Sequence, residues 1–292
     1  MKKIKIYKSY NLQKLSTFNI GGNAEFFCMP KTISHIFEAL KFANNNSLDI
    51  YVIGGGSNIL FSDIGLKGIV ISTKKLNNYQ ISGNIITVEA GIIFKKLNKL
   101  MIKHNLKGLE FTGGLPGTIG GAVFMNARAY GNEMSEVIKS VTAIKKNCQI
   151  IHLKNKELDF SYKGSIFKKN PDLLIYNITL ELKNGNLKEI KKNYKKNIND
   201  RISKEQYDYP SAGCIFKNNY EKGIIAGKII DELGLKGLKI GDAEVFRKHA
   251  NFIINKNKAR AEDVKKLIEL IEKKVYEEKK IKLEREIVLL GF

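Results

Sequence analysis

The chain has 292 residues, of which 43% are hydrophobic, and this composition is typical of a globular protein with two or three domains rather than of a disordered chain. The formal net charge is +21, but only five of the 50 basic residues are arginine, whose forked guanidinium best suits base and phosphate recognition. The excess lysine is scattered without interleaved aromatic residues. We therefore interpret it as solvated surface charge and expect no nucleic-acid partner, although it would attract anionic small molecules.

The three cysteines, Cys28, Cys148 and Cys214, are odd in number and far apart, so the sequence predicts neither a disulfide framework nor a metal site. This number and spacing of cysteines is what we expect of a protein in the reducing cytoplasm. The four histidines share no metal-ligand spacing, and we expect no metal. Because no run of about 18 apolar residues occurs, we expect no membrane partner, and the basic segment 1–14 lacks the apolar region of a signal peptide.

The first 75 residues are predicted to form a small α+β unit. Residues 16–30 are typical of a turn followed by a strand, and apolar residues at helical spacing predict a helix over 32–46. Short strands are expected over 51–53 and 68–72.

A glycine loop, Gly54 to Asn58, follows the strand 51–53. Glycine lets the backbone approach a ligand closely, and successive backbone N–H groups can form a nest for phosphate oxygens. Ser57 and Asn58 add side-chain donors. Taken alone, the pattern also describes an ordinary tight turn, which is the commoner explanation.

The stretch 76–200 is rich in expected strands and holds a second glycine cluster. The expected elements are strands over 85–88, 137–144, 150–153 and 173–182, a helix over 94–104, and a surface helix over 186–206. The cluster at 113–121 has five glycines, with Pro116 to stiffen the turn and Thr118 as a donor. It matches neither a Walker A loop nor a GxGxxG fingerprint, which disfavours ATP and a Rossmann cofactor. Two nests in one chain could still cradle one pyrophosphate.

Residues 201–292 are expected to contain helices over 224–233 and 261–279, the second with one apolar stripe. An alternating strand is expected over 281–290, with Arg285 interrupting its apolar face and Glu286 on its polar face.

Three places hold side chains that could carry chemistry. The polar and basic segment 162–168 could bind a phosphate or form a turn. Cys214, near Lys217 and Asn218, is either an inert buried thiol or a proton donor beside an anion-binding lysine. Glu286 by itself is more often a solvated carboxylate than a functional one.

Taken together, these segments resemble one family, the UDP-N-acetylenolpyruvoylglucosamine reductases. Any one motif is modest evidence, but the ordered set is highly specific and runs from about residue 15 to residue 291. The matching motifs are Thr17-Phe18-Asn19-Ile20-Gly21-Gly22, residues 53–60, residues 113–127, residues 211–218, His249-Ala250-Asn251-Phe252-Ile253 and Leu283-Glu284-Arg285-Glu286-Ile287.

The resemblance implies an α+β protein of three domains. Residues 1–75 and 76–200 would be the two subdomains of a vanillyl-alcohol-oxidase-type (PCMH-type) FAD-binding fold, and residues 201–292 an α+β substrate-binding domain. FAD would be held non-covalently, with NADPH as co-substrate. The implied cofactor-binding residues are Ile53, Gly54, Gly55, Gly56, Ser57, Asn58, Gly113, Gly114, Pro116, Gly117, Thr118, Gly120, Gly121, Asn126 and Ala127.

The implied activity is NADPH-dependent reduction of the enolpyruvyl group of UDP-N-acetylglucosamine-enolpyruvate to UDP-N-acetylmuramate. This reaction belongs to peptidoglycan synthesis, and so to cell-wall biogenesis, cell shape and cell division. By position, Lys163 and Glu286 would stabilise the enolate-like intermediate and Cys214 would protonate it. Position in the motif favours Glu286 over Glu284. Tyr162, Lys217 and Asn218 would contact the UDP-sugar, and we expect a cytoplasmic monomer.

Two departures from the family pattern affect the chemistry. Lys163 stands where the family usually has arginine. Lysine keeps the charge but loses the bidentate fork, which leaves room for lower activity. Cys214 stands where serine is usual, and a thiol, with a reference pKa of about 8.5, gives up its proton more readily than an alcohol. The alternatives are another oxidase of the same fold, a basic nucleic-acid-binding protein with a relict enzyme fold, and a degenerate reductase disabled at Lys163. Many such oxidases attach flavin through histidine, which neither glycine loop contains.

Overall fold

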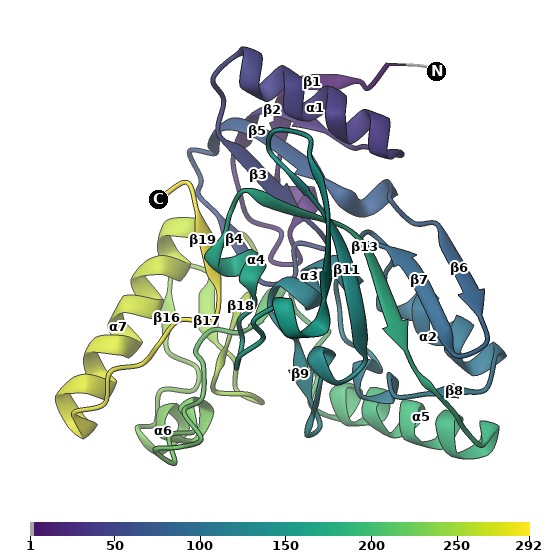
Figure 1. The fold of residues 1–292 in the computed structure, drawn as a ribbon. Coiled ribbons are helices and arrows are strands. Elements are labelled where there is room, and N and C mark those ends of the chain that lie inside the picture. Colours follow the sequence, from purple (N-terminus) through teal and green to yellow (C-terminus); the bar gives the residue numbers. More distant parts are fainter. Residues whose placement is uncertain (1–2) are drawn as a thin grey trace. The chain divides into compact units, whose positions relative to one another are not determined.

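The computed structural model describes residues 3–292 and has an α+β fold, as predicted (Figure 1). Contacts between backbone segments divide the chain into two compact units. Unit 1 gathers residues 3–8, Phe26–Gly55 and Gly68–Arg201, and unit 2 gathers Ser9–Glu25, Gly56–Lys67 and Ile202–Phe292. The three-domain division at residues 75 and 200 stays a prediction.

The N-terminal sheet has four strands in the order β1 (Ile6–Asn11), β2 (Asn23–Cys28), β5 (Leu66–Ser72) and β3 (Ile50–Ile53). Helix α1 (Ile33–Asn45) begins after Thr32, whose hydroxyl accepts the His35 N–H at 3.3 Å as an N-cap. Apolar side chains of α1 and β5 share one core, to which Leu40 and Ile71 belong. The strands predicted over 51–53 and 68–72 and the helix over 32–46 are confirmed.

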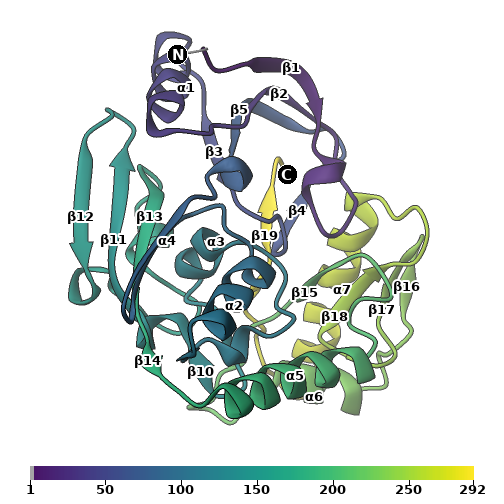
Figure 2. The ribbon, with the colours of Figure 1, turned by 90° about the vertical axis from the view of Figure 1, so that its right-hand side faces the viewer.

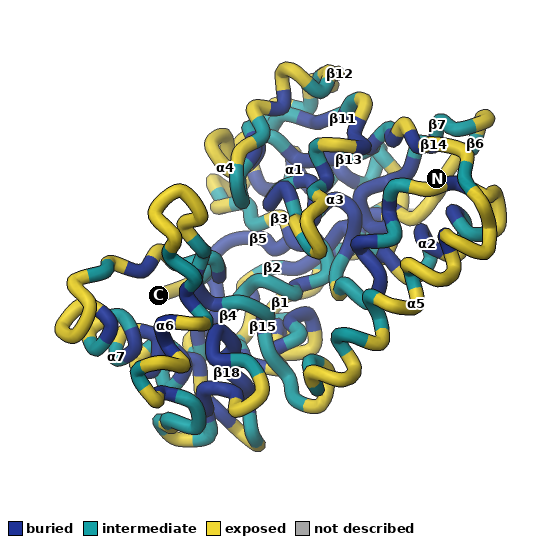
Figure 3. The backbone as a smooth tube through the Cα atoms, turned by 90° about the horizontal axis from the view of Figure 1, so that it is seen from below, coloured by how far each residue is buried: buried dark blue, intermediate teal, exposed yellow. Residues whose placement is uncertain are grey.

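The second sheet lies in unit 1 and is antiparallel. Its order is β12 (Ile150–Lys154), β11 (Ile138–Lys145), β13 (Leu173–Glu181), β7 (Ile85–Glu89), β6 (Tyr79–Ser82). Helices α2 (Phe94–Lys103) and α3 (Ile119–Phe124) share an apolar core with it (Figure 2). The surface helix predicted over 186–206 is α5 (Leu187–Ser203), which buries only Ile190 (Figure 3). Shorter elements of this unit are β8 (Leu106–Lys107), β9 (Arg128–Ala129), β10 (Asn132–Glu133), α4 (Ile166–Lys169) and β14 (Lys183–Asn184).

Unit 2 contains a four-stranded antiparallel sheet with helices α6 (Ala226–Glu232) and α7 (Ala261–Lys279). The strand order is β15 (Ser211–Cys214), β18 (Phe252–Asn255), β17 (Ala243–Val245), β16 (Lys239–Ile240). The predicted apolar stripe of α7 is confirmed, because Val264, Leu267, Ile268, Ile271 and Val275 are all buried and share a core with both helices and the sheet.

The last strand is shorter than predicted. Only β19 (Val288–Leu290) forms, pairing in parallel with β4 (Ile59–Phe61). Leu283 and Ile287 are buried, so the predicted alternation of burial is present at those positions. The Arg285 side chain instead turns to Glu272 of α7, with Nε–Oε1 and Nη2–Oε2 distances of 2.6 and 2.7 Å, and its backbone makes only one isolated bridge, to Phe216. Residues 281–287 therefore lie outside a continuous strand ladder.

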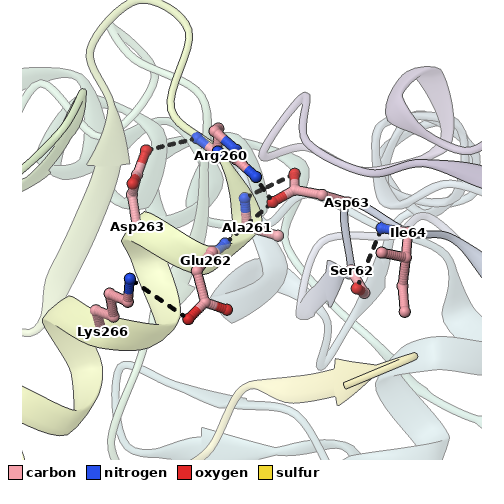
Figure 4. Close-up of polar contacts among 8 residues, drawn as sticks. All are labelled: Ser62, Asp63, Ile64, Arg260, Ala261, Glu262, Asp263 and Lys266. Carbon is pink, nitrogen blue, oxygen red and sulfur yellow. Dashed lines mark hydrogen bonds and ion pairs between the residues drawn. The ribbon is translucent and has the colours of Figure 1, made fainter.

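The N-terminus of α7 is capped by a distant residue. The Asp63 carboxylate accepts the backbone N–H groups of Ala261 at 2.9 Å and Glu262 at 3.2 Å (Figure 4). Arg260 approaches the same carboxylate, with its Nε 3.8 Å from Oδ2. A carboxylate here satisfies two of the helix's open donors and lies at the positive end of its dipole.

Candidate active site

The two glycine loops meet within unit 1. A Cβ atom on Gly54 would lie 2.3 Å from the Thr118 hydroxyl oxygen, and one on Gly55 would lie 2.4 Å from the Gly117 Cα. Such distances are far inside van der Waals contact, so a side chain at Gly55 would displace backbone. The close approach explains why glycine occupies both loops and makes Gly54, Gly55, Gly117 and Thr118 one continuous surface.

This surface fits the pyrophosphate of a dinucleotide. Gly114 and Gly117 have φ of +73° and +109°, a region that favours glycine. Across residues 3–292, the backbone N–H groups of Gly55 and Gly117 donate no hydrogen bond to the protein. Paired glycine N–H groups of this kind can hold phosphate oxygens. The remainder of the first loop belongs to unit 2, where the Gly56 carbonyl accepts the Thr17 N–H at 3.0 Å.

Asn126 follows α3 and is 1% exposed, with φ of +41°. Its side-chain Nδ2 donates to Glu133 Oε1 at 3.0 Å and to the Ser161 carbonyl at 3.1 Å, and its Oδ1 accepts the Ser135 N–H at 3.0 Å. Both donor hydrogens of the amide are therefore used by the protein. Contact of Asn126 or Ala127 with the cofactor stays a prediction.

Tyr162 and Lys163 form the tip of a tight turn, which is one of the two structures expected for this segment. Ser161 and Gly164 close the turn by exchanging two backbone hydrogen bonds, each 3.1 Å long. Lys163 has φ of +57°, and its Nζ lies 6.0 Å from the centroid of the Tyr162 ring. A lysine in the left-handed region is unusual, and such strain often occurs at functional sites.

In unit 2, Cys214 ends β15 and pairs in register with Phe252 of β18. Its side chain packs at a small apolar cluster formed by Phe246, Phe252 and Ile254. Cys214 is half-buried, whereas Cys28 is fully buried and burial raises its pKa to about 12. Cys28 is thus the inert thiol, and Cys214 is the more accessible one.

Glu286 is held beside the Cys214 segment by its backbone. Its N–H donates to the Ile215 carbonyl at 2.7 Å, and its carbonyl accepts from Asn58 Nδ2 at 3.0 Å. Glu284 instead forms an ion pair with Lys217 and has a side chain 72% exposed. Asn58 thus connects the first glycine loop to the last segment of the chain within unit 2. Lys163 belongs to unit 1, while Cys214, Lys217 and Glu286 belong to unit 2.

Asn218, a predicted substrate contact, is engaged in local structure. Its Oδ1 accepts the Ala226 N–H at 3.0 Å, at the start of α6, and its Nδ2 donates to the Tyr220 hydroxyl at 3.0 Å. Its contact with substrate stays a prediction.

Asn251 is a supporting residue that sequence reasoning missed. Buried to 4% exposure, its side chain accepts the Phe216 N–H at 2.9 Å and donates to the Phe216 carbonyl at 2.8 Å, and its own carbonyl accepts the Ile215 N–H at 2.9 Å. These three bonds fix the backbone that follows Cys214. The motif His249 to Ile253 was the available signal, but its spacing gave no partner.

The motif Thr17 to Gly22 also supports the Cys214 strand. The Thr17 hydroxyl donates to the Ser211 carbonyl at 2.7 Å, and the Ser211 N–H donates to the Thr17 carbonyl at 3.1 Å. Phe18 and Ile20 are buried in the core of unit 2. This motif therefore anchors the start of β15.

Comparison with known proteins gives matches to one reductase family and to an FAD binding domain. A family model for the C-terminal domain of UDP-N-acetylenolpyruvoylglucosamine reductase matches residues 205–290, and an FAD binding domain model matches residues 24–154. The reductase of Clostridium novyi is 39% identical over 280 residues, covering 96% of this chain and 90% of that protein. The reductase of Borreliella burgdorferi is 42% identical over 294 residues, covering 100% and 97%.

Two solved structures have folds similar to that of this chain. The reductase (MurB) from Thermus caldophilus matches with a TM-score of 0.83 and 32% identity, covering 100% of both chains. A solvent-stable cholesterol oxidase matches 62% of this chain and 38% of its own, with a TM-score of 0.50 and 15% identity, a likeness of fold alone. In the part of the chain that the structure describes, no helix combines the length and apolarity needed to cross a bilayer.

Proposed function

This chain belongs to the UDP-N-acetylenolpyruvoylglucosamine reductase family and is an FAD-containing oxidoreductase of peptidoglycan synthesis, and we propose that Lys163, Cys214 and Glu286 are its catalytic residues. The observation that supports this most is the pair of backbone hydrogen bonds that hold Glu286 between Ile215 and Asn58. Cys214, half-buried at the end of β15, directly precedes Ile215.

The surface of Gly54, Gly55, Gly117 and Thr118 would hold the FAD pyrophosphate. We propose that the remaining residues of both glycine loops contribute to a non-covalent site, as the sequence predicted. The chemistry that FAD supplies when bound is transfer of hydride from NADPH to the terminal carbon of the enolpyruvyl group.

Hydride addition leaves negative charge on the carbon beside the substrate carboxylate. The Lys163 ammonium stabilises this developing charge. Glu286 is the second group that we propose to stabilise this charge. The Cys214 thiol then breaks its S–H bond and gives the proton to this carbon, which completes the lactyl ether of UDP-N-acetylmuramate and leaves a thiolate.

Tyr162, Lys217 and Asn218 are the proposed substrate contacts. Lys217 is 16% exposed at its side chain and paired with the outer carboxylate of Glu284, so an anionic substrate would compete with Glu284 for the ammonium. We further propose a cytoplasmic monomer that serves cell-wall synthesis, and hence cell shape and division, without nucleic-acid or membrane partners.

The test is NADPH consumption by the purified protein with and without UDP-N-acetylglucosamine-enolpyruvate, with flavin absorbance recorded in the same sample. Substrate-dependent consumption by a yellow protein is expected. A yellow protein without substrate-dependent NADPH consumption would support the alternatives of an oxidase of this fold or a disabled reductase. Cys214→Ala should retain flavin reduction by NADPH and lose product formation, and unchanged product formation would remove Cys214 from the mechanism.

A further inference from the structure

The turn that presents Lys163 is attached to the end of α3 at two points. On one side, the Ser161 carbonyl accepts Nδ2 of Asn126 at 3.1 Å. On the other, the Ser165 hydroxyl, fully buried, donates to the Phe124 carbonyl at 2.8 Å. Phe124 is the last residue of α3 and Asn126 lies two residues after it, so both attachment points follow the second glycine loop closely.

Asn126 is itself fixed. Its Nδ2 also donates to Glu133, its Oδ1 accepts the Ser135 N–H, and the Ser135 hydroxyl hydrogen-bonds to the same Glu133 carboxylate. With 1% exposure, the amide has one orientation in which all these partners are satisfied. A fixed amide is suited to holding the turn in one position.

The turn needs such support because Lys163 adopts an unfavourable backbone conformation. At φ of +57°, a lysine tends to relax toward negative φ unless its neighbours hold it. The two hydrogen bonds between Ser161 and Gly164 close the turn but do not orient it relative to the glycine loop. The bonds to Asn126 and Phe124 connect the turn to the residues that follow the glycine loop, in addition to the bond that Lys168 Nζ donates to the Lys163 carbonyl at 3.2 Å.

We propose that Asn126 is a positioning residue for Lys163, with Ser165 as the second point of attachment. The inference rests on the catalytic role proposed for Lys163 and assigns the Asn126 side chain to the turn rather than to the cofactor. Hydride transfer to substrate requires the Lys163 ammonium at the developing charge, whereas reduction by NADPH does not involve that charge. Loss of the Asn126 amide should therefore affect only the second half of the catalytic cycle.

Asn126→Gly separates this role from the role of Asn126 in ending α3. Glycine is the favoured residue at positive φ after a helix, so the helix end is retained while the side-chain bonds are lost. We expect flavin content and the rate of flavin reduction by NADPH within about twofold of wild type, and reoxidation by substrate at least about tenfold slower. In a crystal structure of the variant, Lys163 should leave the left-handed region.

The decisive measurement is a double-mutant cycle with Lys163→Met. If Asn126 acts through Lys163, Asn126→Gly should cause no further loss of reoxidation rate in the Lys163→Met background. Equal losses in both backgrounds, or normal reoxidation in Asn126→Gly alone, would overturn the proposal. If Lys163→Met itself reoxidises normally, the catalytic role of Lys163 fails instead, so the two failures are distinguishable.

Asn84→Ala is the control. Its amide also donates to a backbone carbonyl, that of Leu182 at 2.8 Å, which belongs neither to the turn nor to the residues that hold Asn126. It should leave reoxidation within about twofold of wild type. If Asn126→Gly does not fold, Ser165→Ala replaces it in the same cycle, and additive losses there would overturn the proposal in the same way.

Discussion

Lys163 combines a half-buried position, a left-handed backbone and a turn anchored on both sides. An ordinary surface lysine needs none of these. The ammonium supplies charge but not the two parallel hydrogen bonds that a guanidinium gives a carboxylate. In the proposed mechanism, the geometry of the turn would compensate for part of the loss of the usual arginine, because it limits the positions that the ammonium can occupy.

Restoring arginine should raise the rate of substrate reduction. Lys163→Arg keeps the charge and adds a second donor, which we expect to increase reoxidation by substrate by about two- to tenfold, the value of one hydrogen bond of about 0.5–1.5 kcal/mol. Stopped-flow absorbance of the flavin measures this step. Lys163→Met is the paired control and should slow the step by about 10²–10³-fold. A slower step in Lys163→Arg would show that the turn is built for lysine.

His249 should make stability depend on pH. Burial, followed by the positive charges of Lys204 and Lys236, lowers its pKa from 6.5, and its Nδ1 is buried without a hydrogen-bond partner among residues 3–292. Because the unfolded chain binds this proton at a higher pH than the folded chain does, stability should fall as pH drops from 6.5 through the lowered pKa.

His249→Phe tests this dependence, since phenylalanine keeps a ring against Phe252, now 4.3 Å away between centroids, and cannot titrate. Thermal unfolding should lose less stability in the variant than in wild type when pH is lowered from about 7.5 to about 5.5. Identical losses in the two proteins would mean that His249 is not the responsible group.

At the scale of elements, hydrophobic periodicity predicted those helices and strands whose boundaries are set by the burial of their own apolar face. Helix 261–279 was predicted to the residue because its stripe from Val264 to Val275 is one continuous core face. The strand over 281–290 was predicted too long, since Arg285 is drawn to Glu272 by an ion pair that no local pattern reveals. The short strands of unit 2, such as Ala243–Val245, were missed because a three-residue buried strand has no measurable period.

Asp63 should stabilise α7 through its N-terminus. Asp63→Ala removes both acceptors for Ala261 and Glu262, with an expected cost of about 0.5–2 kcal/mol. Hydrogen exchange of peptides from the first turn of α7 should become faster, while exchange in the second sheet of unit 1 stays unchanged. Glu277→Gln is the control, because it removes an exposed ion pair with Lys273 far from the first turn of α7 and should leave exchange of that turn unaltered. Unchanged exchange in Asp63→Ala would contradict the capping role.

At the scale of the whole molecule, the glycine loops and motifs predicted the family, but not how the units are assembled from the chain. Unit 2 joins residues as distant in sequence as Thr17 and Ser211, 194 apart, and Asn58 and Glu286, 228 apart. Contacts of this kind depend on tertiary packing, which spacing along one chain does not encode. For the same reason, the hydrogen bond from Asn126 to Ser161 was not foreseen, and the expected contact of Asn126 with the cofactor stays a prediction.

The excess of positive charge gives the last prediction. With 50 basic and 29 acidic residues, the protein should draw anionic NADPH toward itself, so kcat/KM for NADPH should fall by about tenfold as salt rises from about 0.02 to 0.5 M, while kcat changes by less than about twofold. NADH, which lacks one phosphate, should show a shallower fall and serves as the control. Steady-state kinetics at several salt concentrations measures both slopes. Equal slopes for NADPH and NADH would mean that steering by net charge does not set the association rate, and the lysines would then act only as solvated surface.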